Sequence, residues 1–362
     1  MVQIGMFYQI QVPRPWTATS EAERYRDMLE QVSYADEAGF SSVWLAEHQF
    51  RFEWSHSSAP DVSLGAISQI TKNLRLGIAV VVPPVHHPLH IAARIATLDI
   101  LSNGRVDMGI GRSAYPYQMD AFGTSLQDAT GIVDEALDII PRAWTEEEMT
   151  YNGHYFKFPP RTILPKPLQT PHPPIWQGCS RDESFQKAGQ LGLGCIAQGG
   201  PERIAEPIRL YREAIKQAVP VGKVVHDRVV ASAEVFCHED RKTALTRGAE
   251  LIDWYRNQRI QRDNTVWTGH DVDDVPGDYR WHYDRSAASR SQQDDTPSIE
   301  LIERGDYCIG DPDDCIRFLE RYEAAGVDEM IPLFQIGPIT NPEVLKTLDL
   351  FSKYVIPHFS KG

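Results

Sequence analysis

The chain has 362 residues, enough for one large barrel or two modest domains, and 42% of them are hydrophobic and 24% charged, as in ordinary globular proteins. Its formal net charge of −14 argues against binding to a nucleic-acid backbone, which needs clustered lysine and arginine. The same charge disfavours an anionic membrane surface but leaves room for a local basic pocket. We therefore expect no nucleic acid and no membrane among its partners.

The cysteines and the first residues of the chain indicate the cellular compartment to expect. The five cysteines are Cys179, Cys195, Cys237, Cys308 and Cys315. Their number is odd and no CxxC occurs, so we expect neither a disulfide framework nor a zinc site, and a cytoplasmic location. The opening MVQIGMFYQI lacks a basic region with a long apolar core, so no signal peptide is expected. No run of about 18 apolar residues predicts a membrane span.

Strand-like and helix-like segments alternate along the chain. Strands are expected at 3–8, 42–46, 75–82, 106–110, 174–177, 194–197, 229–236 and 329–334. Helices are expected at 21–38, 60–71, 89–101, 132–144, 181–191, 202–218, 241–259, 312–325 and 342–354, and Gly39, Gly192 and Gly326 follow three of them. Eight such strands predict an α/β fold of the (β/α)₈ TIM-barrel type. A doubly wound sheet is the alternative, and the lack of a full GxGxxG motif favours the barrel.

Two segments interrupt the alternation. Residues 145–173 contain six prolines and read as an irregular insertion before the fifth strand. Residues 260–306 are highly polar, and a loop of that length is usually functional or disordered. Its aromatic residues, Trp267, Tyr279, Trp281 and Tyr283, can cover a pocket, so we interpret this segment as an active-site lid. No repeat or composition shift marks a linker, and a single domain over 1–362 is expected.

The first candidate site follows the second strand, where the chain reads Trp44-Leu45-Ala46-Glu47-His48. Active-site residues of barrels lie at the carboxyl ends of the strands. A carboxylate beside an imidazole can tune a proton-transfer group. The alternative is that Glu47 and His48 are ordinary polar loop residues, and their position favours function for His48.

The second candidate is Arg112, in the Gly-Ile-Gly-Arg-Ser run that ends the fourth strand. An arginine there can clamp a phosphate with two hydrogen bonds, or it can pair with a neighbouring carboxylate. Both alternatives remain open from this motif alone.

The third candidate is the helix start after the fifth strand. Ser180 and Glu183 match a capping box, which alone explains the pattern. A helix N-terminus also binds phosphate, and Arg181 and Ser184 add a cation and a hydroxyl.

Other catalytic classes lack their signatures. His86, His87 and His90 have no HExxH pattern beside them, so we expect them to shape a loop and expect no metal site. No GxSxG motif occurs, and the cysteines have no triad signature.

Over nearly its whole length the chain resembles the bacterial luciferase-like, reduced-FMN-dependent monooxygenases. The Trp44-x-x-Glu47-His48 element, the run GIAVVVPPVHHP and the stretch DILSNGRVDMGIGRSAYP carry the resemblance. It implies proton handling by His48 beside Glu47, an active-site Tyr115, and a non-proline cis peptide at Ala79-Val80 that supports the flavin. It also implies that Arg112 binds the FMN phosphate, with Ser180, Arg181 and Ser184 at the other phosphate positions.

The chain departs from luciferase itself at Gly111, which replaces a reactive cysteine, and at Gln49, which replaces a second histidine. Thiol chemistry is therefore not inherited, and light emission is not expected.

The implied activity is that of a two-component flavin-dependent monooxygenase. A separate NAD(P)H-dependent flavin reductase supplies reduced FMN, O2 adds to form a C4a-(hydro)peroxyflavin, and one oxygen atom enters a small organic substrate, such as an aldehyde, a ketone or another apolar metabolite. Homodimers are common among relatives, and a homodimer is expected here.

The substrate pocket and the activity leave alternatives open. Six aromatic residues suggest an apolar pocket or, equally, barrel core: Phe7, Tyr8, Trp44, Phe50, Trp54 and Tyr115. The alternative activities are an F420-dependent dehydrogenase on the same barrel, a non-catalytic flavin-binding protein, and a sugar- or phosphate-handling barrel without flavin.

Overall fold

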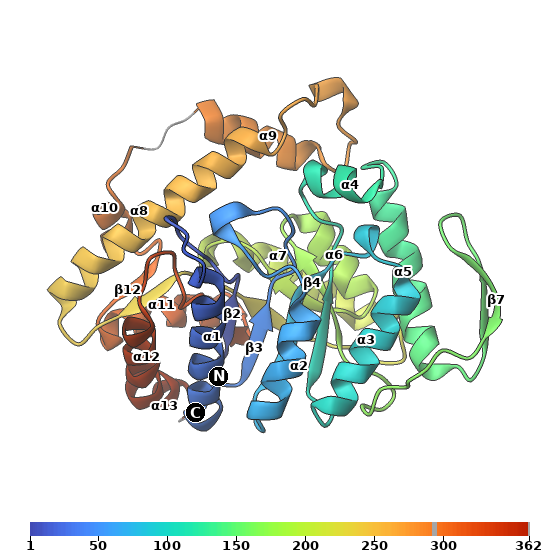
Figure 1. Ribbon diagram of the computed structural model, residues 1–362, viewed down its shortest axis with the longest axis horizontal. Helices are drawn as coiled ribbons and strands as arrows, with labels where there is room; N and C mark the ends of the chain where they lie inside the picture. Colours follow the sequence, from blue (N-terminus) through green and yellow to red (C-terminus); the bar gives the residue numbers. More distant parts are fainter. Residues whose placement is uncertain (292–294, 361–362) are drawn as a thin grey trace.

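A parallel barrel forms the centre of the molecule (Figure 1). The computed structural model describes residues 1–291 and 295–360. Within them, the barrel strands are β1 (Gln3–Ile4), β2 (Met6–Tyr8), β3 (Ser42–Leu45), β4 (Arg75–Val81), β5 (Val106–Ile110), β8 (Ile175–Cys179), β9 (Gly194–Ala197), β10 (Val229–Ala231) and β13 (Glu329–Met330). They pair in the order β1-β13-β10-β9-β8-β5-β4-β3-β2, all parallel. Because β1 and β2 are one strand interrupted at Gly5, this order closes an eight-stranded barrel, and the predicted TIM barrel is confirmed.

Helices cover the outside of the barrel, as they must where a parallel sheet is buried on both faces. Those described are α1 (Ser20–Glu37), α2 (Pro60–Ile70), α3 (Pro88–Leu101), α4 (Pro116–Phe122), α5 (Ala129–Thr145), α6 (Asp182–Gln190), α7 (Pro201–Ala214), α8 (Arg241–Thr265), α9 (Arg280–Ser291), α10 (Ser298–Arg304), α11 (Pro312–Ala324), α12 (Asn341–Leu350) and α13 (Ile356–Phe359). Short 3-10 turns lie at Phe52–Trp54, Pro83–Val85, Ile215–Gln217 and Val272–Asp274, and a π turn at Phe351–Val355 joins α12 to α13.

Two tryptophans fill the interior of the barrel. Trp44 and Trp176 meet edge to face, with ring centroids 5.3 Å apart, and both are buried. A glycine on a neighbouring strand makes room for each indole. A Cβ at Gly77 would lie 2.1 Å from Trp44, and a Cβ at Gly194 would lie 2.5 Å from Trp176. The barrel is therefore plugged below the carboxyl ends of its strands, which leaves that end for a site.

Several expected elements differ from the structure. The strand expected at 329–334 is shorter, because β13 covers only Glu329–Met330. The expected strand at 229–236 is two strands, because β10 ends at Ala231 and β11 (Val235–Cys237) pairs instead with β12 (Cys308–Gly310) in a separate two-stranded sheet. The insertion at 145–173 is not wholly irregular. It contains an antiparallel hairpin of β6 (Met149–Asn152) and β7 (Lys157–Arg161), whose turn is fixed by backbone N–H groups that donate to the carboxylate of Glu135.

The segment at 260–306, expected to be a polar loop, is largely helical where it is described. It contains the end of α8 and all of α9 and α10, and Figure 1 shows α8 and α9 across the top of the barrel. We call residues 262–286 the roof segment. Its apolar side chains Val266, Trp267, Val275 and Tyr279 pack with Val82, Met119, Leu126 and Ala129 in a cluster separate from the main core. The roof is therefore attached to the barrel by its own small core.

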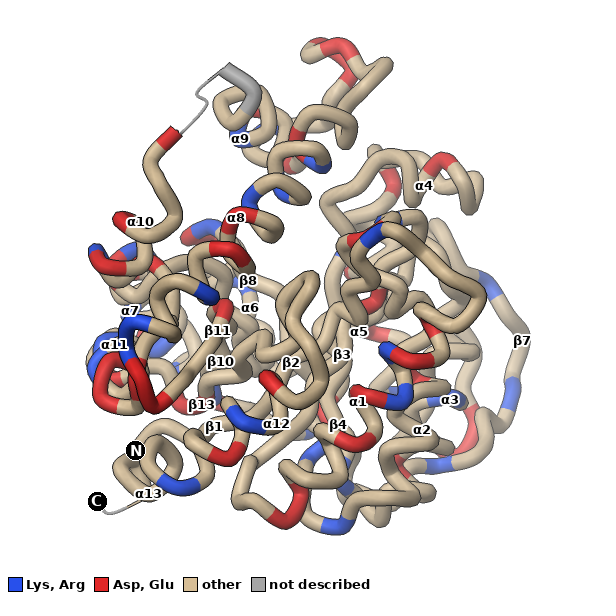
Figure 2. Tube along the Cα trace, turned by 60° about the vertical axis from the view of Figure 1, so that its left-hand side comes forward, with Lys and Arg blue, Asp and Glu red and all other residues tan. Residues whose placement is uncertain are grey.

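Charged residues lie mainly on the outer helices and loops, while the inner strands are largely uncharged (Figure 2). All five cysteines are buried free thiols. In the described part of the chain, none of the helices combines the length and the apolarity that a membrane crossing requires.

Candidate active site

A cavity of about 460 Å³ opens at the carboxyl ends of β3, β4, β5, β8 and β9, beneath the roof segment. All nine residues singled out from the sequence line it, namely Glu47, His48, Ala79, Val80, Arg112, Tyr115, Ser180, Arg181 and Ser184. They come from four separate strand ends, which the closure of the barrel brings together. The structure thus places these residues in one site, and their individual roles remain predictions.

Glu47 contacts a different histidine from the one expected. Its carboxylate lies 2.5 Å from Nε2 of His86 and accepts hydrogen bonds from the backbone N–H of Val82 and the amide of Gln49. No hydrogen bond joins it to His48 among the described residues, so any influence of Glu47 on His48 does not pass through a direct hydrogen bond. Adjacent residues in an extended chain point in opposite directions, which takes the Glu47 carboxylate toward the loop after β4.

His48 is held as a neutral imidazole. Its Nδ1 is sealed from solvent and has no hydrogen-bond partner among the described residues. Burial lowers the pKa of His48 well below its usual value, and the nearby guanidinium groups of Arg51 and Arg262 lower the pKa further. The ring meets that of Tyr115 edge to face, with centroids 6.0 Å apart. At neutral pH this histidine can accept or donate a hydrogen bond without carrying charge.

Tyr115 lies under the influence of Arg51, a residue that sequence reasoning missed. The guanidinium carbon of Arg51 is 4.2 Å from the centre of the Tyr115 ring. Burial alone would raise the pKa of Tyr115, but the positive charges of Arg51 and Arg262 outweigh burial and lower that pKa. The phenol is therefore a better proton donor than an isolated tyrosine.

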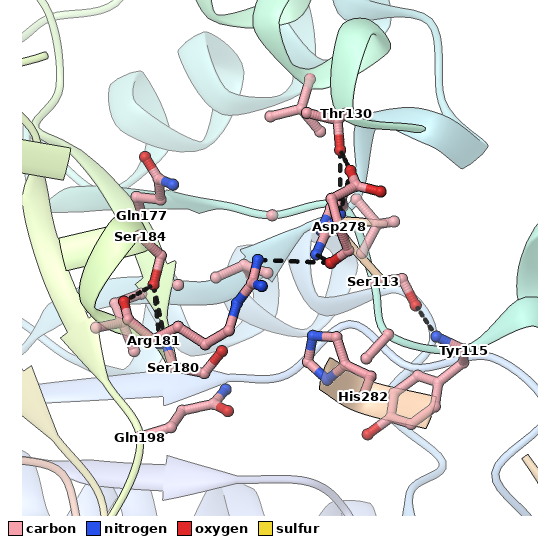
Figure 3. A pocket seen from close by; sticks show the side chains of 18 of the residues that line it. Ser113, Tyr115, Thr130, Gln177, Ser180, Arg181, Ser184, Gln198, Asp278 and His282 are labelled. Carbon is pink, nitrogen blue, oxygen red and sulfur yellow. Dashed lines mark hydrogen bonds and ion pairs between the residues drawn. The ribbon is translucent and has the colours of Figure 1, made fainter. Parts of the chain in front are cut away.

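Arg112 pairs with a carboxylate, which is one of the two alternatives that its sequence motif left open. Its guanidinium contacts both the carboxylate and the backbone carbonyl of Asp278, in the roof segment, and lies 3.1 Å from the hydroxyl of Thr130 (Figure 3). The Thr130 hydroxyl donates to the same carboxylate. Arg181 reaches the Asp278 carbonyl at 3.5 Å from the opposite side. Arg112 and the Thr130 hydroxyl thus contact the carboxylate of Asp278, while both arginines contact its backbone carbonyl.

The helix start beside this cluster is built differently from the expected capping box. Helix α6 begins at Asp182 with Arg181 as its N-cap residue, one position later than the Ser180–Glu183 pairing predicts. The reason is the hydroxyl of Ser184, which accepts hydrogen bonds from the backbone N–H groups of Ser180 and Arg181 at 3.0 and 3.1 Å. Ser184 therefore shapes the turn that aims Arg181 into the cavity.

Backbone and small residues form the opposite wall. The peptide bond between Ala79 and Val80 is cis, as the resemblance implies. A Cβ at Gly111, directly after β5, would lie 2.6 Å from Cγ2 of Val80. A cysteine at position 111 would therefore require the Val80 side chain to shift.

Of the two alternatives left open for the six aromatic residues, an apolar pocket or barrel core, the pocket does not hold for most of them. Of the six described aromatic residues named for it, only Tyr115 lines the cavity. Tyr8 and Trp44 are fully buried in the core, and Phe50 is 56% exposed. Phe7, Tyr8 and Trp44 lie on β2 and β3, whose side chains alternate between the inside and the outside of the barrel, and Phe50 and Trp54 lie in the segment after β3.

Several lining residues carry no signal in the sequence. They are Gln177, Gln198, Arg262, Asp263, Asp278, His282 and Arg285, and five of them come from the roof segment. Burial and then the charges of Arg112 and Arg181 lower the pKa of His282 to about 3. A polar stretch without a motif offers no means to tell such lining residues from solvated ones.

Comparison with known proteins gives the family. A family model described as luciferase-like monooxygenase matches residues 2–329. The chain is 32% identical over 189 residues to the oxygenase component of the flavin-dependent trigonelline monooxygenase of Acinetobacter baylyi, a match that covers 52% of this chain and 51% of that protein. It is 24% identical over 349 residues to an F420-dependent glucose-6-phosphate dehydrogenase of Amycolatopsis mediterranei, covering 94% and 97% of the two chains.

A solved structure agrees with the fold across the full length. The monooxygenase RslO1 of Streptomyces bottropensis superposes with a TM-score of 0.78 at 25% identity, covering 99% of this chain and all of that one. With the family model matching most of its length, this chain belongs to the luciferase-like monooxygenase family.

Proposed function

We propose that the protein is the oxygenase of a two-component, reduced-FMN-dependent monooxygenase that uses O2 to insert one oxygen atom into a small organic substrate. The observation that carries the proposal is the convergence of a cationic end, at Arg112 and Arg181, with a proton-handling end, at His48 and Tyr115, in one cavity. The name of the Acinetobacter relative, an oxygenase component, supports the two-component arrangement. A separate NAD(P)H-dependent flavin reductase is then required as the source of reduced FMN.

The residues at the cationic end fit a phosphate. Arg112 already holds an oxyanion, the Asp278 carboxylate, with Thr130 beside it. Guanidinium groups and hydroxyls are the donors that a phosphate monoester prefers, and bound FMN would replace Asp278 as their acceptor. When bound, FMN supplies the oxygen chemistry, and the protein supplies position and surroundings.

The protein's own contribution to the reaction lies in water exclusion and proton control. The roof segment, proposed here as the lid, covers the cavity and keeps bulk water away from the reacting atoms. His48, neutral and buried, offers a hydrogen-bonding nitrogen that does not titrate near neutral pH. Tyr115 holds a proton that the neighbouring guanidinium of Arg51 makes easier to release. A homodimer in the cytoplasm remains the expectation for its assembly and location.

A second candidate is an F420-dependent dehydrogenase on the same barrel, favoured by the full-length match to the Amycolatopsis enzyme. Anaerobic titration with reduced FMN and, separately, with reduced F420 tests the choice through quenching of protein fluorescence. We expect reduced FMN to bind at least tenfold more tightly. Tighter binding of F420 would support the dehydrogenase, and no binding of either would support a barrel without flavin.

A further inference from the structure

The end of the cavity next to His48 and Tyr115 contains two arginines that flank one indole. Arg262 lines the cavity, and Arg51 lies behind Tyr115, where only 6% of it is exposed. The guanidinium carbon of each lies 5.6 Å from the centre of the Trp54 ring. Trp54 is itself buried, so both cations are held in place by packing against a fixed aromatic surface.

The carboxylates nearby do not balance these charges. Arg262 pairs with Asp263, at 2.7 Å from its Nε. Among the described residues Arg51 forms no ion pair. Its Nη1 is 3.4 Å from the Tyr117 hydroxyl, and its Nη2 is buried without a partner. Glu234 lies close enough to Tyr255 to raise the pKa of that phenol, but it pairs with neither arginine in the described structure. Since a buried charge is costly unless it is paired, the guanidinium of Arg51 leaves positive charge at this end of the site that no described carboxylate offsets, whereas Arg262 has one carboxylate partner, Asp263.

The pKa shifts of His48 and Tyr115 agree with an excess of positive charge at this end of the cavity. Arg51 and Arg262 both lower the pKa of His48, and both lower the pKa of Tyr115. Arg285, which also lines the cavity, adds a third cation that forms no ion pair among the described residues. Both signs of charge line the cavity as a whole, including the carboxylates of Glu47 and Asp278. At this end, however, the guanidinium groups of Arg51, Arg262 and Arg285 form one ion pair in the described structure, that of Arg262 with Asp263, and such a local excess of positive charge attracts anions.

We infer that the organic substrate is an anion that pairs its carboxylate with Arg262, inside the positive field of Arg51, and so holds its carbon skeleton beside His48 and Tyr115. The inference rests on the proposed monooxygenase function and names the substrate class for it. The site is distinct from the phosphate end, where Arg112 and Arg181 converge on Asp278. It replaces the apolar aldehyde or ketone expected from the sequence by an acid.

Pairs of acids and their primary amides test the inference without any mutation. Benzoate and benzamide, nicotinate and nicotinamide, and hexanoate and hexanamide are each titrated by calorimetry into the protein alone and into the protein saturated with oxidised FMN. We expect at least one acid to bind tenfold more tightly than its amide. Equal affinities in all three pairs, or a failure of every acid to bind, would overturn the inference.

Variants then locate the preference. Arg262→Gln is expected to abolish the acid-over-amide preference while changing FMN affinity less than twofold, and Arg262→Lys is expected to retain part of it. The matched control is Arg209→Gln on α7, which removes an exposed arginine paired with Glu206 and Glu213 and leaves both affinities unchanged.

Two results would contradict the inference, because they would assign Arg262 to the flavin or place the bound acid at the phosphate end. One is a tenfold loss of FMN affinity in Arg262→Gln, since this arginine would then serve the flavin. The other is loss of the preference in Arg112→Gln with Arg262→Gln unaffected, since the acids would then occupy the phosphate end. If FMN fails to bind, the proposed function fails, while the comparison on the protein alone still decides this inference.

Discussion

At the scale of single residues, the cavity is defined by charges that meet across long distances in the sequence. Arg112 and Asp278 are 166 positions apart, yet their side chains form the central contact of the cationic end. Arg112 could be proposed from its motif at the end of a strand. Asp278 could not, because it lies in a stretch with several other aspartates and no periodic pattern.

Replacement of Arg112 by alanine tests the phosphate assignment. We expect Arg112→Ala to weaken the binding of reduced FMN by about 1–3 kcal/mol, the range for a charge-assisted hydrogen bond. Anaerobic fluorescence titration measures the change. Arg94→Ala, which removes an arginine paired with Asp61 on the outer helices, is the control. Unchanged affinity in Arg112→Ala would refute the assignment.

His282 should make the protein acid-sensitive. The pKa of His282 is lowered to about 3 in the folded protein. Below about pH 6.5 the histidine is therefore protonated in the unfolded chain but stays neutral in the folded protein. Stability is therefore lost as the pH falls from about 6.5 toward 3, and above about 6.5 the histidine has no effect. We expect the melting temperature of His282→Gln to fall less steeply over this window than that of the parent protein.

Thermal unfolding measured at pH 7.5, 6 and 5 gives this comparison. His154→Gln, which replaces an exposed histidine in the hairpin turn, controls for the loss of a histidine as such. Parallel curves for His282→Gln and the parent would show that the His282 imidazole is not shielded from protons in the folded state.

At the scale of elements, the roof segment shows where prediction from sequence ends. The barrel strands are short apolar runs, a pattern that buried parallel strands share, and most of them could be placed to within two residues. The strands expected at 229–236 and 329–334 end early, at Ala231 and Met330. Helix α9 carries mostly polar and aromatic side chains, because it packs on the roof's own small cluster and on the cavity instead of the main core. Without a regular apolar stripe it resembles a polar loop in sequence.

The contact between the roof and Arg112 gives a prediction for this element. Asp278 competes with a phosphate for Arg112 and adds a negative charge beside it. We therefore expect Asp278→Asn to tighten FMN binding a few-fold, about 1 kcal/mol. Asp284→Asn, at an exposed position on α9, is the matched control in the same titration. Weaker binding in Asp278→Asn would mean that the carboxylate supports the flavin site instead of occupying it.

At the scale of the whole molecule, closure of the barrel is what brings most of the site residues together. Four strand ends that are far apart in sequence become neighbours, so residues proposed separately from their motifs share one cavity. The direction of each side chain is a finer matter than its place on the barrel. Glu47 turns to His86 and not to His48, and the six aromatic residues divide between core, surface and cavity. These outcomes depend on packing between elements, which local patterns do not encode.

The most direct measurement of the central claim is stopped-flow absorbance after the protein, mixed anaerobically with reduced FMN, meets oxygen. Our account predicts a transient species whose absorbance differs from that of both reduced and oxidised FMN, and whose decay rate changes when an acid substrate is present. Featureless reoxidation at the rate of free reduced FMN would contradict the account and leave F420-dependent hydride transfer or simple flavin binding in its place.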